Sequence, residues 1–103
     1  MCTLSCLYKE HGYTLFFNRD EQKSRPVATK PELRSLNQTC YISPTDTLEG
    51  GTWIWANAHG LSAAVLNHYE SDFVPESSER LSRGTLLASL ADARTAQDAA
   101  TRL

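Results

Sequence analysis

Cys2, which directly follows the initiator methionine, is the residue whose type and position most clearly suggest chemistry. Removal of Met1 is expected before a small residue, and it would leave a cysteine that carries a free α-amine. Such an amine titrates near neutral pH and can accept the thiol proton, so one residue supplies both the nucleophile and its base. The competing interpretation is that Cys2 is a small buried residue of the first strand, because free cysteine is common in protein cores.

The other cysteines and histidines do not indicate a metal site. Cys2 and Cys6 are separated by three residues, and only the distant Cys40 and His11 could complete a ligand set, whereas structural zinc sites use closely spaced pairs. Three cysteines in a chain without an export signal argue against a disulfide framework. We therefore expect neither a metal nor another cofactor.

The length and composition are typical of one small domain or of a piece of a larger one. We therefore assign residues 1–103 to a single domain. Ten basic and twelve acidic residues give a formal net charge of −2, and the basic residues are scattered rather than gathered in the patch that nucleic-acid binding requires. No apolar run approaches the ~20 residues of a membrane span, and the N-terminus lacks the basic and apolar regions of a signal peptide. We expect a cytoplasmic protein that neither binds nucleic acid nor spans a membrane.

Two antiparallel hairpins are predicted to position the chemical groups, over residues 3–18 and 52–67. The first strand alternates, with Leu4 and Cys6 on one face, and a polar turn with a glycine leads into aromatic and β-favouring residues. The second hairpin has two short strands joined by a tight connection, and each hairpin ends in polar side chains. We expect both hairpins in one sheet, with Cys6 in the core.

Helices are predicted toward the end of the chain. A leucine stripe over residues 86–90 indicates a helix that begins at Ser82 or Arg83. Thr95 and Asp98, three residues apart, resemble the capping box of a second helix. The predicted fold class is therefore α+β, an antiparallel sheet with helices on one face and the other face uncovered.

Two segments are expected to be irregular. Residues 22–38 are poor in apolar side chains and contain two prolines, and residues 70–79 are rich in serine and acidic residues. A short strand is expected near residues 40–42. Trp53 and Trp55 share one face of the second hairpin, and we expect them to pack against helices rather than line a ligand site.

Several short motifs occur along the chain in a fixed order. They are Met1-Cys2-Thr3, Asn18-Arg19-Asp20-Glu21, Ser24-Arg25-Pro26, Gly50-Gly51-Thr52-Trp53, His59-Gly60-Leu61 with Leu66-Asn67, and Ser82-Arg83-Gly84. In order and spacing, they resemble the NRDE family, also called the transport and Golgi organisation family. Members of that family are generally more than twice this length, so the resemblance implies that residues 1–103 are the N-terminal part of one domain. A last helix without a stop signal and a half-covered sheet agree with this expectation.

The resemblance extends to N-terminal-nucleophile hydrolases of the cholylglycine hydrolase and penicillin acylase group, and it implies their four-layer αββα fold. In those enzymes the N-terminal cysteine attacks an amide carbonyl, an arginine and an aspartate orient it, and an asparagine donates to the oxyanion. The resemblance thereby implies Cys2, Arg19, Asp20 and Asn67 as catalytic residues. Arg19 and Asp20 are adjacent here, whereas the hydrolases separate the corresponding pair by two residues. Either Asp20 or Glu21 is therefore the acid that faces the nucleophile.

These assignments are chemically coherent, because a cation favours a nearby thiolate, a carboxylate anchors an α-ammonium group, and a side-chain amide donates to an oxyanion. Each residue also has a structural interpretation: Arg19 with Asp20 or Glu21 as a surface ion pair, and Asn67 as a turn former. The function indicated is hydrolysis or transfer of an acyl group from a small-molecule amide through a thioester on Cys2. The alternative is a non-catalytic protein of the same fold, active in lipid or haem handling or secretory organisation. An uncovered sheet face would also favour self-association.

Overall fold

The computed structural model of the protein describes residues 2–67 and 82–103. The chain has α+β architecture, as predicted. Its elements are β1 (Thr3–Lys9), β2 (Gly12–Asn18), β3 (Glu32–Leu36), β4 (Thr39–Ser43), β5 (Ile54–Asn57), β6 (Ser62–Ala64), α1 (Arg83–Ser89) and α2 (Ala96–Thr101). All strand pairs are antiparallel, in a two-stranded sheet β1-β2 and a four-stranded sheet β3-β4-β5-β6. Met1 and the loop predicted over residues 70–79 lie outside the described residues.

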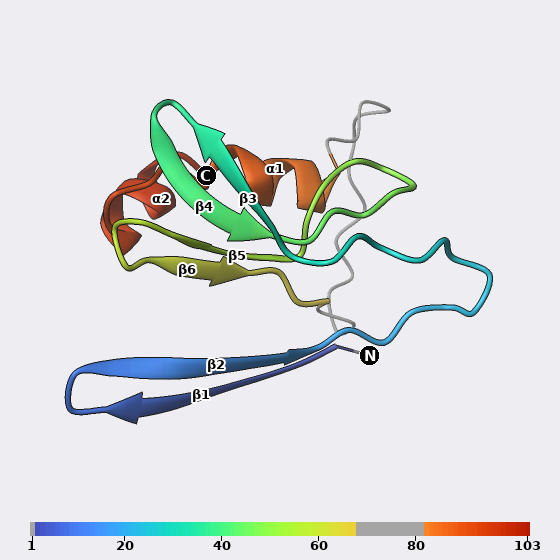
Figure 1. Ribbon diagram of the computed structural model, residues 1–103, viewed down its shortest axis with the longest axis horizontal. Helices are drawn as coiled ribbons and strands as arrows, with labels where there is room; N and C mark the ends of the chain where they lie inside the picture. The colour runs from blue at the N-terminus through green and yellow to red at the C-terminus, as the bar shows by residue number, and fades with distance from the viewer. Residues whose placement is uncertain (1, 68–81) are drawn as a thin grey trace.

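The four-stranded sheet lies between the helices and the hairpin of β1 and β2 (Figure 1). Successive side chains of a strand point to opposite faces of its sheet. Trp55 and its cross-strand partner Ala63 therefore pack against α1, whereas Ala56 and its partner Ser62 face the hairpin. The order of layers is helices, sheet and hairpin, which is consistent with a partial α+β sandwich.

The core lies between β5 and α1, and Trp55 is its centre. This side chain is 1% exposed, and its indole Nε1 donates a hydrogen bond of 2.7 Å to the carbonyl oxygen of Leu87. Leu87, Leu90 and Ala91 close the cluster from the helical side. A buried tryptophan needs both apolar neighbours and an acceptor for its N–H, and α1 supplies both. The predicted packing of the leucine stripe on the second hairpin is confirmed.

Asn57 joins the turn between β5 and β6 to the loop between the two helices. Its side-chain oxygen accepts hydrogen bonds from the backbone amides of His59 and Leu61, each at 3.1 Å. Its side-chain nitrogen donates to the carbonyl oxygens of Ala91 and Ala93, at 3.1 and 2.7 Å. One buried amide thus satisfies four backbone groups and holds the second hairpin against the helices.

The prediction that both hairpins lie in one sheet is wrong, because β1 and β2 form a sheet of their own. The first hairpin instead contacts the face of the four-stranded sheet. The Tyr13 hydroxyl donates to the carbonyl oxygen of Gly60 at 3.1 Å and lies 2.7 Å from the Ser62 hydroxyl. Alternation along a strand indicates that it has two different faces, but it does not indicate which strand lies beside it.

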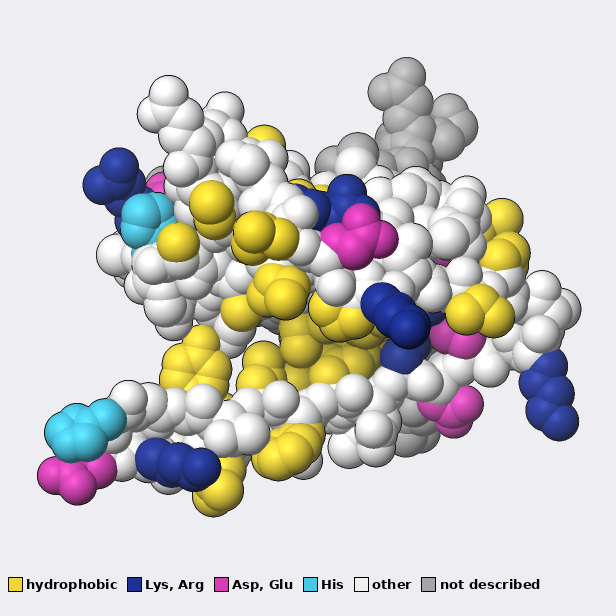
Figure 2. Space-filling view, in the orientation of Figure 1, with side chains coloured by type: hydrophobic (Ala, Val, Ile, Leu, Met, Phe, Trp, Pro, Cys, Tyr) yellow, Lys and Arg dark blue, Asp and Glu magenta, His cyan; other side chains and the backbone are white. Residues whose placement is uncertain are grey.

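A hollow of about 400 Å³ separates the first hairpin from the four-stranded sheet. Figure 2 shows hydrophobic side chains gathered along it, and its lining includes Leu15, Ile42 and Ile54. Cys6 pairs with Leu15 and shares its face, yet Cys6 is exposed. The prediction that Cys6 belongs to the core is therefore wrong, because the two layers are too far apart to enclose it.

Part of the segment predicted as an irregular loop is a strand. β3 pairs with β4 from Glu32 opposite Ser43 to Leu36 opposite Thr39. A two-residue turn, Asn37-Gln38, joins them, and both of its residues have positive φ, at 47° and 67°. Paired positive φ values are typical of the tight turns that match the twist of antiparallel strands. The segment before β3, with both prolines, has no regular structure.

The second helix begins as predicted. The Thr95 hydroxyl accepts a hydrogen bond of 3.0 Å from the backbone amide of Asp98, and the Asp98 carboxylate accepts one of 3.2 Å from the amide of Arg94. This cap satisfies backbone donors that have no partner within the helix. None of the helices in the described part of the chain is long and apolar enough to cross a membrane.

Candidate functional site

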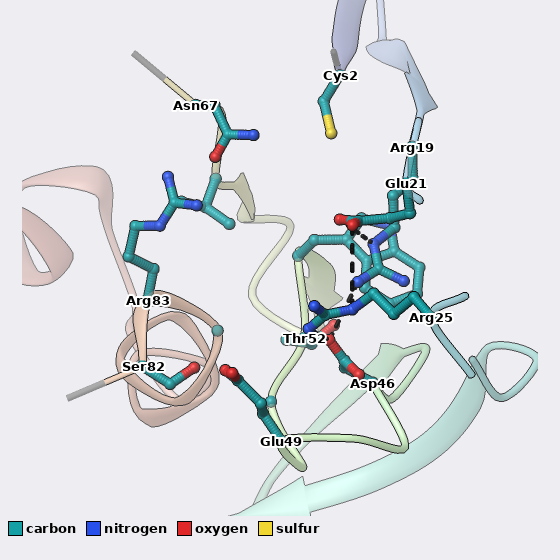
Figure 3. Close-up of a pocket in the computed structure, with 14 residues that line it drawn as sticks. Cys2, Arg19, Glu21, Arg25, Asp46, Glu49, Thr52, Asn67, Ser82 and Arg83 are labelled. Carbon is teal, nitrogen blue, oxygen red and sulfur yellow. Dashed lines mark hydrogen bonds and ion pairs between the residues drawn. The ribbon is translucent and has the colours of Figure 1, made fainter. Parts of the chain in front are cut away.

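A pocket of about 280 Å³ lies where β2 and β6 end and α1 begins. Its walls come from segments far apart in the sequence, among them the connection between β4 and β5 (Figure 3). Most of the lining side chains are polar or charged, with three arginines and three acidic residues: Arg19, Arg25, Arg83, Glu21, Asp46 and Glu49. The pocket is therefore suited to a small polar ligand rather than a long apolar one.

Cys2 and Asn67 point into this pocket from different walls (Figure 3). Cys2 immediately precedes β1 and is partly buried, and Asn67 follows β6. The register of the first hairpin pairs Thr3 with Asn18, so the next residues along the two strands, Cys2 and Arg19, lie at the same end of that hairpin. Three of the predicted site residues therefore line one pocket.

Arg19 is held on the pocket wall by three partners. Its Nη2 donates to the Asp46 carboxylate at 3.0 Å, and its Nε lies 3.3 Å from the Glu21 carboxylate. Its guanidinium also stacks on the Trp53 ring, 4.0 Å from the centroid. Trp53 thus lines the pocket, and the prediction that it packs against helices in the way Trp55 does is wrong. With so many contacts, Arg19 has a fixed position and a largely neutralised charge.

Asp46 is the acidic centre of this cluster. Its buried carboxylate accepts hydrogen bonds from Arg19, from Arg25 at 2.5 Å and from the backbone amide of Leu48 at 3.0 Å. Burial of the carboxyl disfavours its charged form. The hydrogen bonds from Arg25 and from the Leu48 amide, together with the charges of both arginines, outweigh burial, so the pKa of Asp46 lies below its ordinary value. The carboxylate is therefore ionised at neutral pH and ties the end of β2 to the β4–β5 connection.

Of the two acids after Arg19, Glu21 lines the pocket and Asp20 does not. Both residues are exposed, but Glu21 contacts Arg19 and lies 4.0 Å from Nε of Arg25. The structure thus brings Cys2, Arg19 and Asn67 together and places Glu21 beside them. The catalytic role assigned to Asp20 stays a prediction.

Two facing glycines bring α1 to the pocket. A Cβ atom on Gly51 would lie 2.5 Å from the carbonyl carbon of Gly84, and one on Gly84 would lie 2.9 Å from the carbonyl oxygen of Thr52. The amide of Thr52 also donates to the carbonyl oxygen of Gly84 at 3.2 Å. Only residues without a side chain allow this approach. The contact places Ser82 and Arg83, which directly precede Gly84, on the pocket wall.

Sequence reasoning assigned no role to Arg25, Asp46, Glu49 or Arg83. Asp46 and Glu49 lie in a loop without periodicity, and their proximity to Arg19 depends on how that loop folds back. Arg25 and Arg83 did stand in two of the short motifs, which was the one signal available for them. Among the described residues, no group of three or more histidine, cysteine or acidic side chains could hold a metal ion.

The family model described as Transport and Golgi organisation 2 matches residues 1–103, which is the entire sequence. The chain belongs to the Transport and Golgi organisation 2 family. No curated protein and no solved structure matches it closely enough for comparison.

In this Transport and Golgi organisation 2 chain, each of the six short motifs supplies at least one residue to the pocket. They contribute, in sequence order, Cys2, Arg19 with Glu21, Arg25, Gly51 to Trp53, Asn67, and Ser82 to Gly84. The motifs are spread over more than eighty residues, from Cys2 to Gly84, yet they converge on one cavity. The pocket is therefore the candidate functional site.

Proposed function

We propose that the protein hydrolyses or transfers an acyl group from a small amide or thioester through a covalent thioester on Cys2. The observation that carries the proposal is the thiol of Cys2 and the amide of Asn67 pointing into one polar pocket of about 280 Å³. A nucleophile and an oxyanion donor on opposite sides of a reacting carbonyl are the minimum that acyl transfer requires. The likeness to N-terminal-nucleophile hydrolases supports the same chemistry.

In this proposal, removal of Met1 gives Cys2 a free α-amine that accepts the thiol proton. The sulfur then attacks the carbonyl carbon, and the side-chain amide of Asn67 donates a hydrogen bond to the oxygen that becomes negative. The C–N or C–S bond of the substrate breaks, and the leaving group takes the proton from the α-ammonium group. Water, or another amine or thiol, attacks the resulting thioester and restores the free thiol of Cys2.

Arg19 has a supporting role in this proposal. Its contacts with Glu21, Asp46 and Trp53 fix a cation at the end of the hairpin that carries Cys2. A guanidinium held in this way keeps the groups around Cys2 in place without reorganising during the reaction, while its charge is largely balanced by the two carboxylates. Glu21 is the acid that lines the pocket, and Asp20 is the alternative partner for the α-ammonium group.

The second candidate is a role in transport without catalysis, which the description of the family favours. A mainly apolar groove of about 520 Å³ between β6 and the helices, lined by Val65, Leu86 and Ala99 among others, offers a surface for an apolar ligand. A protein of this kind would keep its function when Cys2 is replaced by Ala. The two candidates therefore differ in whether they need the thiol.

The test is to trap the acyl-enzyme in the full natural chain. The protein is incubated briefly with an acetyl thioester and its peptides are mapped by mass spectrometry. We expect the N-terminal peptide to begin at Cys2 and to carry one acetyl group, and we expect Asn67→Ala to slow this acylation by about 10²-fold or more, which is typical of losing an oxyanion donor. Cys6, an exposed thiol on the same hairpin, is the internal control. Acylation of Cys6 at the same rate as Cys2, or a mature chain that keeps Met1, would exclude this mechanism.

A further inference from the structure

Two of the three arginines in the pocket are neutralised by the protein itself. Arg19 contacts the carboxylates of Glu21 and Asp46 and stacks on Trp53. Arg25 donates to the same Asp46 carboxylate and lies 4.0 Å from Glu21. These two cations are therefore parts of an internal ion-pair network, and a bound anion would have to compete with fixed carboxylates for them.

Arg83 is different. It is the first residue of α1, its side chain is exposed, and it extends beside Asn67 on the pocket wall (Figure 3). It makes no ion pair or hydrogen bond through its guanidinium with any residue that the structure describes. A guanidinium carries five N–H donors in a planar fork, a geometry that matches the two oxygens of a carboxylate. Among the residues that the structure describes, Arg83 is therefore the one arginine of the pocket without a carboxylate partner.

The backbone, and not a counter-ion, holds Arg83 in this place. The close contact of Gly51 with Gly84 and the hydrogen bond from the Thr52 amide to the Gly84 carbonyl fix the start of α1 against the β4–β5 connection. The backbone of Arg83 is therefore fixed at the edge of the pocket before any ligand arrives. Preorganisation of this kind reduces the entropy lost when a ligand binds.

We propose that Arg83 binds a carboxylate on the substrate, so that the reaction on Cys2 acts on small carboxylated amides or thioesters. The part of this inference that concerns the reaction rests on the proposed function. The binding of a carboxylate by Arg83 does not depend on that function. Arg83 and Asn67 lie on one wall and Cys2 on another, so a short substrate can reach Arg83 with its carboxylate while its carbonyl lies between Cys2 and Asn67. A cavity of about 280 Å³ is large enough for a short dicarboxylic chain.

The first test compares two substrates in the full natural chain: glutaryl 4-nitroanilide and its methyl ester, which has the same chain length without the charge. We expect the wild type to prefer the acid, and we expect Arg83→Ala to lower kcat/KM for the acid by about 10- to 100-fold, the worth of a hydrogen bond to a charged group. The methyl ester should react equally with both proteins. Arg83→Lys keeps the positive charge but loses the planar fork of donors. Its kcat/KM for the acid should therefore lie between those of the wild type and Arg83→Ala.

The matched control is Arg94→Ala. Arg94 is exposed and lies outside the pocket, so its loss changes the net charge equally without removing the proposed contact. We expect this variant to keep the wild-type preference for the acid. Arg83 is exposed as well, so thermal melts of all variants should coincide with that of the wild type. Equal preference for acid and ester in the wild type, or an unchanged preference in Arg83→Ala, would overturn the inference while leaving the proposed function intact.

The second test measures binding without catalysis. Alkylation of Cys2 by iodoacetamide is followed by peptide mapping in the presence of glutarate or of neutral glutaramide. Glutarate should slow the alkylation of Cys2 in the wild type and in Arg94→Ala, but not in Arg83→Ala, and glutaramide should not slow it in any of them. If both anilides are inert and glutarate still protects through Arg83, the carboxylate site stands and the proposed reaction fails. Protection that is equal for the two compounds, or that survives loss of Arg83, contradicts the site.

Discussion

Asp46 shows how one carboxylate can organise a site that no local sequence pattern predicts. It receives hydrogen bonds from Arg19 and Arg25, so residues that follow β2 are tied to the loop that follows β4. Each arginine alone could point into solvent, as surface arginines usually do. With Asp46 between them, both side chains are fixed on the wall of the pocket that contains Cys2. The geometry around the thiol therefore depends on a residue that has no chemical role of its own.

We predict that Asp46→Asn destabilises the protein in a pH-dependent manner. The pKa of Asp46 in the folded protein lies below its ordinary value of 3.8, so ionised Asp46 stabilises the fold. That contribution is complete above the ordinary pKa and is lost as the pH falls through the lower pKa of the folded state. At pH 7 the variant should lose about 1–2 kcal/mol of unfolding free energy, a modest value because solvent reaches the partly exposed arginines and weakens the interaction. The difference from wild type should shrink below pH 4.

Urea denaturation at several pH values measures this effect, and Glu32→Gln is the matched control. Glu32 lies 3.6 Å from Arg34 on β3, and the Glu32 side chain is 55% exposed. Removing the same charge there should change the unfolding free energy by less than about 0.5 kcal/mol at any pH. A loss in Asp46→Asn that is constant between pH 3 and pH 7 would show that charge is not the cause.

Among the elements, α1 has two functions that depend on different residues. Its apolar side closes the core through Leu87 and Leu90. Its first turn meets the β4–β5 connection through Gly84 and Gly51, and this contact sets the position of Arg83. The helix is only seven residues long, so its stability depends on these tertiary contacts more than on its own hydrogen bonds.

We predict that Gly84→Ala perturbs both stability and the pocket. A Cβ atom there would lie 2.9 Å from the carbonyl oxygen of Thr52, which is backbone and cannot rotate away. The start of α1 must shift, at a cost of about 1–3 kcal/mol. Thr85→Ala, one residue later on an exposed position of the same helix, should be within about 0.5 kcal/mol of wild type. Thermal denaturation compares the two variants, and equal melting temperatures would show that the glycine contact is not needed.

The sequence predicted those elements whose signals are local. Alternation predicted β1, aromatic and β-favouring residues predicted β2, the leucine stripe predicted α1, and the threonine–aspartate pair predicted the start of α2. β3 was missed because its turn, Asn37-Gln38, lacks the glycine that makes such turns recognisable, and because two prolines precede it. Pairing between distant strands leaves no local signal at all, which is why the first hairpin was placed in the wrong sheet.

The residues of the candidate site likewise fall into those that the sequence predicted and those that it did not. Cys2 stands out in the sequence because its position is chemically special, and Arg19 and Asn67 were found through motifs at strand ends. Asp46 and the stacking of Arg19 on Trp53 are products of tertiary folding. Alternation treated both tryptophans alike, whereas the first of them lies before β5 begins and turns toward the pocket.

At the scale of the whole molecule, the layers are incompletely packed. β1 is exposed along its entire length, and the hairpin leaves a hollow of about 400 Å³ against the sheet. Among the described residues, the buried apolar core consists of one tryptophan, two leucines and two alanines. The 103-residue chain therefore has more apolar surface than its own core can cover.

We predict that residues 1–103 alone associate in solution through the outer face of the first hairpin. Leu7 and Phe16 share that face, because Leu7 pairs with Thr14 and Phe16 with Ser5, and they are 57% and 60% exposed. Contiguous exposed apolar side chains on a strand pair are a typical contact surface between chains. Light scattering over a concentration series should show dimers or larger species.

The double variant Leu7→Ser, Phe16→Ser should shift these species toward monomer, since it removes the apolar contact from the outer face while leaving the inner face, with Leu15, unchanged. Val27→Ser is the matched control, because Val27 is 90% exposed and lies in the segment before β3, outside the first hairpin. It should associate as the wild type does. A wild-type chain that stays monomeric at every concentration and melts in one sharp transition would mean that the three layers are sufficient by themselves, and that the exposed face of the hairpin is simply tolerated.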